Sequence, residues 1–316
     1  MESAFHSAQH TTSLPLHGLI PATVVPMTTA GEVDLVELRR YLSWIADQGP
    51  VALAVTADTG EVAQLSHAEQ LQVVEAATQV TGLPCIAGLT ASSTARAVDR
   101  ANDLRQAGAA ALLVFPTPAF LGARDQVALD YHRAIGEAGL PLIVFQLQPS
   151  LGGVLHRPGP LRRLLELDAV VAIKEASFDR DRFQESAAVV AEVGNVTLLT
   201  GNDTFILESL ALGAEGALLG FGAVMTHAQV TMVDAWRAGR VEEAQAWSAR
   251  LQPLADAIFA APIGDYRSRL KEVLVMLGVL AGAHVRAPLL AIGDEDRSRL
   301  RRVVGAATTT DMAVTA

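Results

Sequence analysis

The sequence is poor in lysine and cysteine. Of its 316 residues only two are lysines, Lys174 and Lys271, and only one is a cysteine, Cys85. A single cysteine cannot form an internal disulfide or a cysteine-based metal cluster. Its apolar surroundings, LPCIAGL, indicate a buried strand residue. This cysteine usage points to a reducing cytosol, so we expect a cytoplasmic protein.

Long apolar runs and an excess of basic charge are also absent. No apolar run reaches the roughly 18 residues of a membrane span. The first 17 residues lack the charged start and apolar centre of a signal peptide. The net charge is −10 and both signs are mixed along the chain, so no basic patch would attract nucleic acid or an anionic membrane. We therefore expect no nucleic-acid partner and no membrane partner.

The sequence does contain a regular alternation of short apolar runs with amphipathic stretches, from Gly18 to about residue 238. The expected strands are 19–25, 51–55, 85–88, 110–115, 140–145, 170–174, 196–200 and 216–219. The expected helices are 34–46, 66–80, 93–107, 125–137, 160–166, 179–193, 204–212 and 227–238. Eight such units favour a closed (β/α)8 TIM barrel over an open doubly wound sheet.

Beyond Gly239 the strand pattern ends, and three helices are expected at 241–258, 265–280 and 294–304. No linker rich in proline, glycine or serine divides the chain. We therefore predict a flexible N-terminal segment at 1–17, the barrel at 18–238, a C-terminal three-helix extension at 239–305 and a tail at 306–316.

Lys174 follows a run of small and branched residues, AVVAI, at positions 169–173. This run is too short for a helix and too apolar for an exposed strand, so it indicates a strand covered on both faces. A desolvated ammonium group loses stability and its pKa falls, so such a lysine can attack a carbonyl and form a Schiff base. The alternative is a lysine at a strand end that leans into solvent or pairs with Glu175.

The loops after the strands carry the other candidate groups, because active sites of such barrels lie at the C-terminal ends of the strands. After the second strand, the Thr59 hydroxyl and the Gly60 amide could hold a carboxylate, or form an ordinary capped turn. Small, polar and aromatic residues follow the fourth, fifth and seventh strands, in PTPAF at 116–120, FQLQPSLGG at 145–153 and GND at 201–203.

Signals for metal or nucleotide binding are weak. The eight histidines show no spacing typical of a metal site, and the glycines match no dinucleotide or Walker pattern. His67, His132 and His227 fall in or next to expected helices, where solvated or capping roles are expected. We predict no metal and no external cofactor.

Four segments together resemble the family of dihydrodipicolinate synthase and N-acetylneuraminate lyase, barrels that form a Schiff base with a 2-oxo acid. They are IPATVVPMTTAGEVD at 20–34, TADTGE at 56–61, VVAIKEAS at 170–177 and LLTGND at 198–203. TADTGE stands where the family has Gly-Thr-Thr-Gly-Glu, and VVAIKEAS resembles its Schiff-base lysine motif. The resemblance covers nearly the whole chain. It implies a class I lyase with Lys174 as nucleophile, and a homo-oligomer, either a dimer or a tetramer.

The sequence departs from the family pattern after the fourth and fifth strands. Phe145 and Gln146 replace a tyrosine and an asparagine, and phenylalanine cannot transfer a proton. The arginine that in the synthases holds the second substrate's carboxylate is missing from PSLGG, and Ala119 and Phe120 replace paired tyrosines. These departures argue against dihydrodipicolinate synthase activity. With them, the sequence pattern resembles more closely the branch of the family that dehydrates 2-keto-3-deoxy sugar acids.

We therefore predict a lyase acting on a pyruvate-type 2-oxo acid or a 2-keto-3-deoxy sugar acid, by carbon–oxygen hydro-lyase or carbon–carbon aldolase chemistry at Lys174. A water molecule, or Asp58 or Glu61, could replace the tyrosine as proton carrier, although Glu61 could equally support its loop. The expected substrate contacts are Thr59, Gly60, Phe120, Phe145, Gln146, Gly201 and Asn202. The alternative is an impaired barrel that binds a 2-oxo acid as a sensor or scaffold, but retaining a costly buried amine argues against it.

Overall fold

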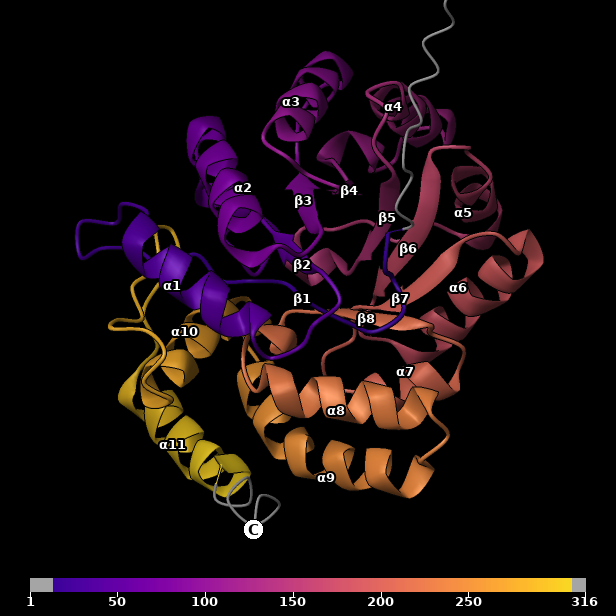
Figure 1. Ribbon diagram of the computed structural model, residues 1–316. Helices are drawn as coiled ribbons and strands as arrows, with labels where there is room; N and C mark the ends of the chain where they lie inside the picture. The colour runs from indigo at the N-terminus through magenta and orange to yellow at the C-terminus, as the bar shows by residue number, and fades with distance from the viewer. Residues whose placement is uncertain (1–13, 309–316) are drawn as a thin grey trace, which may run out of the picture.

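In the computed structural model, which describes residues 14–308, eight parallel strands form a barrel surrounded by helices (Figure 1). The strands neighbour one another in the order β1-β8-β7-β6-β5-β4-β3-β2, and a parallel bridge between Ala22 and Ala54 joins the two ends of this order. The predicted (β/α)8 fold is confirmed.

All of the predicted strands and helices are present, with ends that differ by a few residues. The strands are β1 Leu19–Pro21, β2 Leu53–Val55, β3 Cys85–Leu89, β4 Ala111–Val114, β5 Leu142–Leu147, β6 Val170–Ala176, β7 Thr197–Thr200 and β8 Gly216–Leu219. The barrel helices are α1 Leu35–Ala46, α2 His67–Thr81, α3 Thr94–Gln106, α4 Gln126–Gly136, α5 Pro158–Leu165, α6 Arg180–Val193, α7 Ile206–Ala211 and α8 Thr226–Arg237. Short 3-10 helices lie in four of the loops that follow strands, η1 Val62–Gln64, η2 Pro118–Phe120, η3 Pro149–Leu151 and η4 Phe221–Ala223.

Local sequence accounts for where the helices begin and end. At the start of α2, the Ser66 hydroxyl accepts a hydrogen bond from the Glu69 amide, and the Glu69 carboxylate accepts one from the Ser66 amide. This capping box satisfies two amides that have no partner within the helix. At the ends of α2 and α6, Gly82 and Gly194 adopt left-handed φ angles of 65° and 80°, which cost glycine little.

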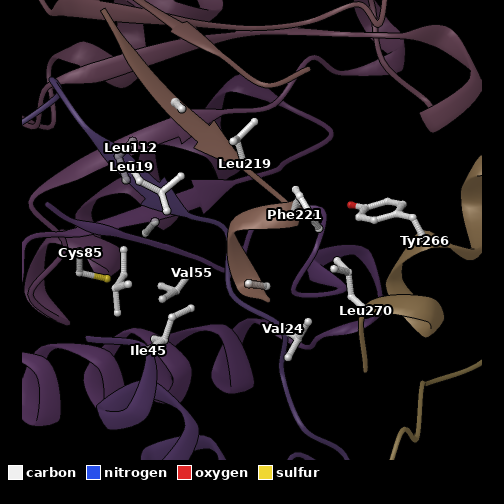
Figure 2. Close-up of a cluster of buried hydrophobic side chains, with 14 of the residues drawn as sticks. Leu19, Val24, Ile45, Val55, Cys85, Leu112, Leu219, Phe221, Tyr266 and Leu270 are labelled. Atoms are coloured by element: carbon white, nitrogen blue, oxygen red, sulfur yellow. The ribbon is translucent and has the colours of Figure 1, made fainter. Parts of the chain in front are cut away.

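Strand residues alternate between two buried layers, one inside the barrel and one between the barrel and its helices. Ile86, Leu113 and Ile143 belong to the inner layer. Figure 2 shows part of the outer layer, where Val55 and Cys85 of the strands face Ile45 of α1. Cys85 is buried in β3, as the sequence predicts.

The C-terminal extension consists of α9 Val241–Ile258, the 3-10 helix η5 Ile263–Asp265, α10 Tyr266–Met276 and α11 Asp294–Thr308. Helix α9 packs against α8 and α11 (Figure 1). Helix α10 ends earlier than predicted, shortly before Gly278, which has a φ of 72°. Helix α11 continues through residues 306–308, which the sequence assigns to a tail.

Residues 1–13 of the predicted flexible segment and residues 309–316 of the predicted tail lie outside the described residues. Between residues 14 and 308, no helix is long and apolar enough to cross a membrane.

Candidate active site

Lys174 lies inside the barrel, near the C-terminal end of β6. It shares the inward face of the strand with Ala172 and Ala176, two residues away on either side. Its register partners are Phe145 on β5 and Leu199 on β7. The strand continues for two residues beyond Lys174, whereas the sequence predicts that it ends there. Small neighbours on the same face leave room for the long side chain.

The Lys174 side chain is buried, with 6% of its surface exposed, and its Nζ lies 4.5 Å from the centre of the Phe145 ring. Burial lowers the pKa of Lys174 to about 8, against the opposing effect of the Asp203 and Asp58 carboxylates. Among the described residues, we find no hydrogen bond or ion pair to this amine. Roughly a tenth of the amine is therefore neutral at pH 7, and this neutral form is the one that nucleophilic attack requires.

The alternative of a Lys174–Glu175 pair is wrong. Glu175 lies on the opposite face of β6. Its carboxylate accepts hydrogen bonds from the Asn202 side chain at 2.7 Å and from the Ser177 amide at 3.2 Å. This carboxylate therefore supports the turn after the strand and does not contact the lysine amine.

A small cavity surrounds the Lys174 amine at the mouth of the barrel. Its volume is about 20 Å³, which is room for about one water molecule, so a substrate must displace some of the surrounding side chains. The other residues that line it are Asp58, Thr59, Phe145, Leu147, Leu151, Ala176, Phe178, Gly201, Asp203, Gly220, Phe259 and Tyr266. Phe178 has a φ of 57°, an uncommon conformation for a bulky residue that is often found at functional sites.

The loop after β7 contributes Gly201 and Asp203. A Cβ at position 201 would lie 2.6 Å from Lys174 Cε, so only glycine leaves room for the lysine in its present position. Asp203 is buried, and its carboxylate accepts a hydrogen bond from the Phe221 amide at 2.6 Å. Burial raises the pKa of Asp203 to about 7, although that hydrogen bond and Lys174 oppose the shift. A carboxyl group with such a pKa can exchange protons near neutral pH.

The loop after β2 contributes Asp58 and Thr59. The Asp58 carboxylate accepts a hydrogen bond from the Tyr266 hydroxyl at 2.7 Å and pairs with Arg267 at 2.5 Å. Tyr266 and Arg267 begin α10, so the C-terminal extension completes the site. The predicted site residues all lie in or after the barrel strands, so this contribution of the helix predicted at 265–280 is an addition from the structure.

Two other residues of the β2 loop do not line the cavity. Glu61 is buried in an ion pair with Lys271 and accepts a hydrogen bond from the Arg286 amide at 2.9 Å. The Gly60 amide donates to the Ala57 carbonyl at 3.0 Å, so it is already engaged within the turn. Both residues shape the loop that presents Asp58 and Thr59.

Gln146 and Asn202 are predicted substrate contacts that do not line the cavity. Gln146 Oε1 accepts a hydrogen bond from the His156 amide at 2.6 Å. Asn202 binds the Glu175 carboxylate, and its Oδ1 accepts from the Phe178 amide at 2.7 Å. Gln146 follows the cavity-lining Phe145 in β5, so strand alternation directs its side chain to the other face. Asn202 lies in the loop after β7, where its hydrogen bonds to β6 and to the turn after it hold its side chain away from the cavity.

Phe120, another predicted substrate contact, lies in an aromatic cluster beside α4. Its ring centre is 5.4 Å from that of Tyr131 and about 6 Å from those of His132 and His156. His132 is buried and its pKa falls to about 4 because of burial, so the predicted solvated or capping role for it is wrong. This cluster packs the loop after β4 and does not line the lysine cavity.

Comparison with known proteins places the chain among similar barrels. The model of the Dihydrodipicolinate synthetase family matches residues 15–307. The 4-hydroxy-tetrahydrodipicolinate synthase of Methanothrix thermoacetophila is 32% identical over 290 residues, which cover 91% of this chain and 95% of that protein. The enzyme of the same name from Archaeoglobus fulgidus is 31% identical over 289 residues, covering 91% and 96%.

Solved structures of similar fold carry related names. A putative dihydrodipicolinate synthetase from Pseudomonas aeruginosa superposes with a TM-score of 0.84 at 27% identity, over 92% of this chain and 99% of that one. A dihydrodipicolinate synthase from Acinetobacter baumannii, solved in complex with pyruvate, gives a TM-score of 0.82 at 27% identity, with the same coverage.

Proposed function

Because the chain belongs to the dihydrodipicolinate synthetase family, we propose that it is a lyase that forms a Schiff base between Lys174 and a 2-oxo acid. The observation that carries this proposal is the state of the Lys174 amine. It is buried, has a lowered pKa and faces a cavity at the end of the barrel where such folds place catalytic groups.

In the proposed reaction, the neutral Lys174 amine attacks the ketone carbon of the 2-oxo acid, and the resulting hydroxyl leaves as water to give an iminium. In dehydration or condensation, a proton leaves the carbon next to the iminium, and its electron pair forms the double bond of an enamine, which then expels a hydroxyl from the following carbon or forms a carbon–carbon bond. In aldol cleavage, the carbon–carbon bond itself breaks at the iminium stage: its electron pair forms the enamine, and the hydroxyl of the departing fragment loses its proton as it becomes a carbonyl. Thr59 lines the cavity and is a candidate donor to the substrate carboxylate.

For the type of reaction, we propose dehydration of a 2-keto-3-deoxy sugar acid, with aldol cleavage as the related alternative. Loss of a hydroxyl from the iminium adduct requires one group that removes a proton and one that donates it. Two carboxyl groups, Asp58 and Asp203, line the cavity, and the pKa of Asp203 lies near neutral pH. Glu61, in its buried pair with Lys271, is better suited to supporting the loop than to acid–base chemistry.

The synthase reaction is the second candidate function, because relatives at 31–32% identity are named 4-hydroxy-tetrahydrodipicolinate synthase. It condenses pyruvate with aspartate semialdehyde, whose carboxylate needs a cationic partner. No arginine occurs in the segment 149–153, so we expect no useful synthesis in a coupled reductase assay. Robust turnover in that assay would make the synthase reaction the function of this chain.

Borohydride trapping tests the Schiff base directly. Reduction in the presence of pyruvate, or of a panel of 2-keto-3-deoxy acids, should add the mass of one reduced adduct to the intact protein. Peptide mapping is unambiguous, because Lys271 is the only other lysine. Product analysis with the same panel then identifies the bond that is cleaved. Absence of an adduct, or its appearance on Lys271, would contradict the proposal.

We also propose a homo-oligomer, on the family resemblance alone. A sedimentation measurement that gives a dimer or a tetramer would support this, and a monomer at micromolar concentration would contradict it.

A further inference from the structure

Tyr266 is the feature of the site that neither the sequence nor the family resemblance assigns. We propose that its hydroxyl carries protons to and from the intermediate on Lys174, with Asp58 as the group that stores the proton. The Tyr266 hydroxyl thus takes the role of the family's tyrosine, whose position in this chain is occupied by Phe145. This inference rests on the proposed Schiff-base chemistry and adds a catalytic residue to it.

Tyr266 is the one tyrosine of the sequence's three that lines the lysine cavity. The other two hydroxyls are engaged elsewhere, since Tyr41 contacts the Ala223 carbonyl at 3.3 Å and Tyr131 donates to the Ala91 carbonyl at 3.2 Å. Figure 2 shows the Tyr266 hydroxyl directed toward Phe221 and the end of β8. Because Tyr266 and Lys174 border one cavity of about 20 Å³, a molecule bound to the amine lies within reach of the hydroxyl.

The contacts of the Tyr266 hydroxyl define a path for the proton. The hydroxyl donates to Asp58 Oδ2 at 2.7 Å, and Thr59 Oγ1 lies 3.5 Å away. A hydroxyl that donates to a carboxylate keeps lone pairs with which to accept a proton from another direction. Burial and the Asp58 carboxylate both raise the pKa of Tyr266 well above its usual value, so the group remains a neutral hydroxyl between proton transfers.

Asp58 is held in place for this role by Arg267. The Arg267 Nη2 atom lies 2.5 Å from Asp58 Oδ1, on the carboxylate oxygen that Tyr266 does not use, and its Nε donates to the Asp58 carbonyl at 2.8 Å. These two contacts fix the carboxylate in the orientation that leaves its Oδ2 atom within hydrogen-bond distance of the Tyr266 hydroxyl. Arg267 is therefore a positioning residue, because it acts through Asp58.

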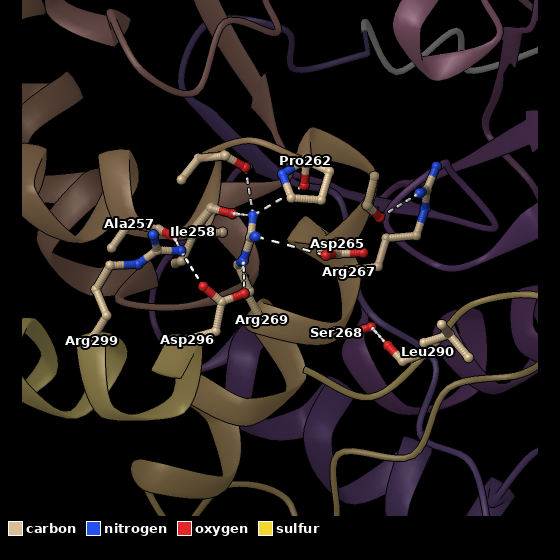
Figure 3. A network of polar contacts seen from close by, with 12 residues as sticks. Ala257, Ile258, Pro262, Asp265, Arg267, Ser268, Arg269, Leu290, Asp296 and Arg299 are labelled. Carbon is tan, nitrogen blue, oxygen red and sulfur yellow. Dashed lines mark hydrogen bonds and ion pairs between the residues drawn. The ribbon is translucent and has the colours of Figure 1, made fainter. Parts of the chain in front are cut away.

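The backbone around Tyr266 is firmly anchored. Figure 3 shows the buried Arg269 side chain bound to the turn that precedes α10. Its guanidinium donates to the carbonyls of Ile258, Ala260 and Pro262 at 2.6–3.2 Å and pairs with Asp296 on α11 at 3.0 Å. The Tyr266 ring stacks on Phe259 at 5.1 Å. Such support fixes the hydroxyl over the cavity, as proton transfer requires.

Tyr266 and Asp58 together take up one proton and return it. Once the iminium has formed, the bond between hydrogen and the neighbouring carbon breaks, and its electron pair forms the enamine. The proton passes to the Tyr266 oxygen while the proton of the Tyr266 hydroxyl passes to the Asp58 carboxylate. In dehydration, the same proton returns from Asp58 through Tyr266 to the leaving hydroxyl, which departs as water. No oxidant, reductant or further reactant is needed.

Hydrogen–deuterium exchange of the pyruvate methyl group tests this step separately from turnover. Exchange in D₂O, followed by proton NMR, requires both the iminium and the proton transfer, whereas borohydride trapping requires only the iminium. In Tyr266→Phe the ring and its stacking on Phe259 remain. We expect the final adduct yield to stay within about twofold of wild type and exchange to slow by roughly a hundredfold or more, as for loss of a general base.

Three further variants complete the test. Tyr41→Phe removes a buried hydroxyl outside the cavity, so it should exchange at close to the wild-type rate. Asp58→Asn keeps an oxygen that can accept from Tyr266 but removes the proton store, so it should also slow exchange while still forming the adduct. Adding Phe145→Tyr to Tyr266→Phe places a hydroxyl near the amine from β5 and should restore exchange by about tenfold or more.

The outcomes separate the two proposals. If wild type forms no adduct with pyruvate, the Schiff-base function fails and the role of Tyr266 fails with it. If wild type forms the adduct and either Tyr266→Phe or Asp58→Asn exchanges at the wild-type rate, the relay is wrong and the Schiff-base function stands. Retained adduct with slow exchange in both variants supports the relay, and the Asp58 variant remains informative if Tyr266→Phe does not fold.

Discussion

The two lysines of this chain are both buried, yet their surroundings differ in the one respect that decides their chemistry. Lys271, on α10, donates hydrogen bonds to the Glu61 carboxylate and to the His284 carbonyl. Lys174 lies against the Phe145 ring and a cavity. Burial lowers the pKa of both lysines, but at Lys271 the direct contact with Glu61 opposes that shift. Burial alone therefore does not identify which lysine is the nucleophile. The two lysines are distinguished by the carboxylate that binds the Lys271 amine and has no counterpart in direct contact with the Lys174 amine.

Two ion pairs connect α10 to the β2 loop, and they have different roles. Arg267 and Lys271 stand four residues apart on α10, on one face of the helix. They pair with Asp58 and Glu61 of the β2 loop. The Lys271 pair is fully buried and neither of its residues lines the cavity, so it fastens the extension to the barrel. The Arg267 pair borders the cavity, so it places Asp58 beside Tyr266.

Replacing each lysine by methionine should separate chemistry from stability, and the largest effect is expected at Lys174. Lys174→Met keeps the length of the side chain and removes the amine, so borohydride trapping with pyruvate should yield no adduct. The free energy of unfolding should not fall, because an unpaired buried amine is replaced by an apolar group. Intact mass and urea unfolding measure the two quantities. An adduct on Lys174→Met would transfer the assignment to Lys271.

Lys271→Met should give the opposite result. Removing one partner of a buried ion pair leaves Glu61 buried without compensation, which costs about 3–5 kcal/mol of unfolding free energy. The surviving folded protein should still form the adduct at Lys174. The double variant Lys271→Met with Glu61→Gln should recover part of the loss, because no unpaired charge remains. Equal stability of Lys271→Met and wild type would show that the pair contributes little.

The architecture could be predicted from the sequence because local periodicity defines its elements. Helix α9 and strand β8 match the predicted 241–258 and 216–219 at both ends. Several strand ends do not match, because a strand ends where its neighbours stop pairing with it. Strand β6 continues to Ala176 since β5 pairs with it as far as Leu147.

The site could be predicted only in part. The sequence predicts Lys174, Phe145 and Gly201 as site residues because they lie in strands or directly after them. Strand alternation would have excluded Gln146, since it neighbours the inward-facing Phe145. Tyr266 could not be predicted from the sequence, because nothing in its local sequence shows that α10 packs over the barrel mouth. That contact depends on a hydrogen bond and an ion pair between residues more than 200 positions apart.

A methyl group beside the lysine should disturb its reactivity without removing the amine. In Gly201→Ala the new Cβ would lie 2.6 Å from Lys174 Cε and 2.8 Å from Ala176 Cβ, so the lysine side chain must move. Displacement of about 1 Å can cost up to roughly a hundredfold in rate, and we expect adduct formation with pyruvate to slow by about tenfold to a hundredfold.

The control for this variant is Gly159→Ala. Position 159 lies in α5, and a Cβ added there would have nothing within 4 Å, so the rate of adduct formation should not change. Wild-type rates in both variants would mean that Lys174 reacts from a different side-chain conformation.

The smallest expected effect is the pH dependence of adduct formation, which reports the free amine of Lys174. With a pKa of about 8, roughly a tenth of the amine is neutral at pH 7. The initial rate with pyruvate, read by mass after borohydride quenching, should therefore rise about tenfold between pH 7 and a plateau above about pH 9.

The Asp203 carboxylate raises this pKa, so Asp203→Asn should move the midpoint to lower pH by about one unit or less. Asp99→Asn, at an exposed position of α3, should leave it unchanged. A midpoint near 10.5, the ordinary lysine value, would show that Lys174 is as solvated as a surface residue, and the contrast with Lys271 would then lose its physical basis.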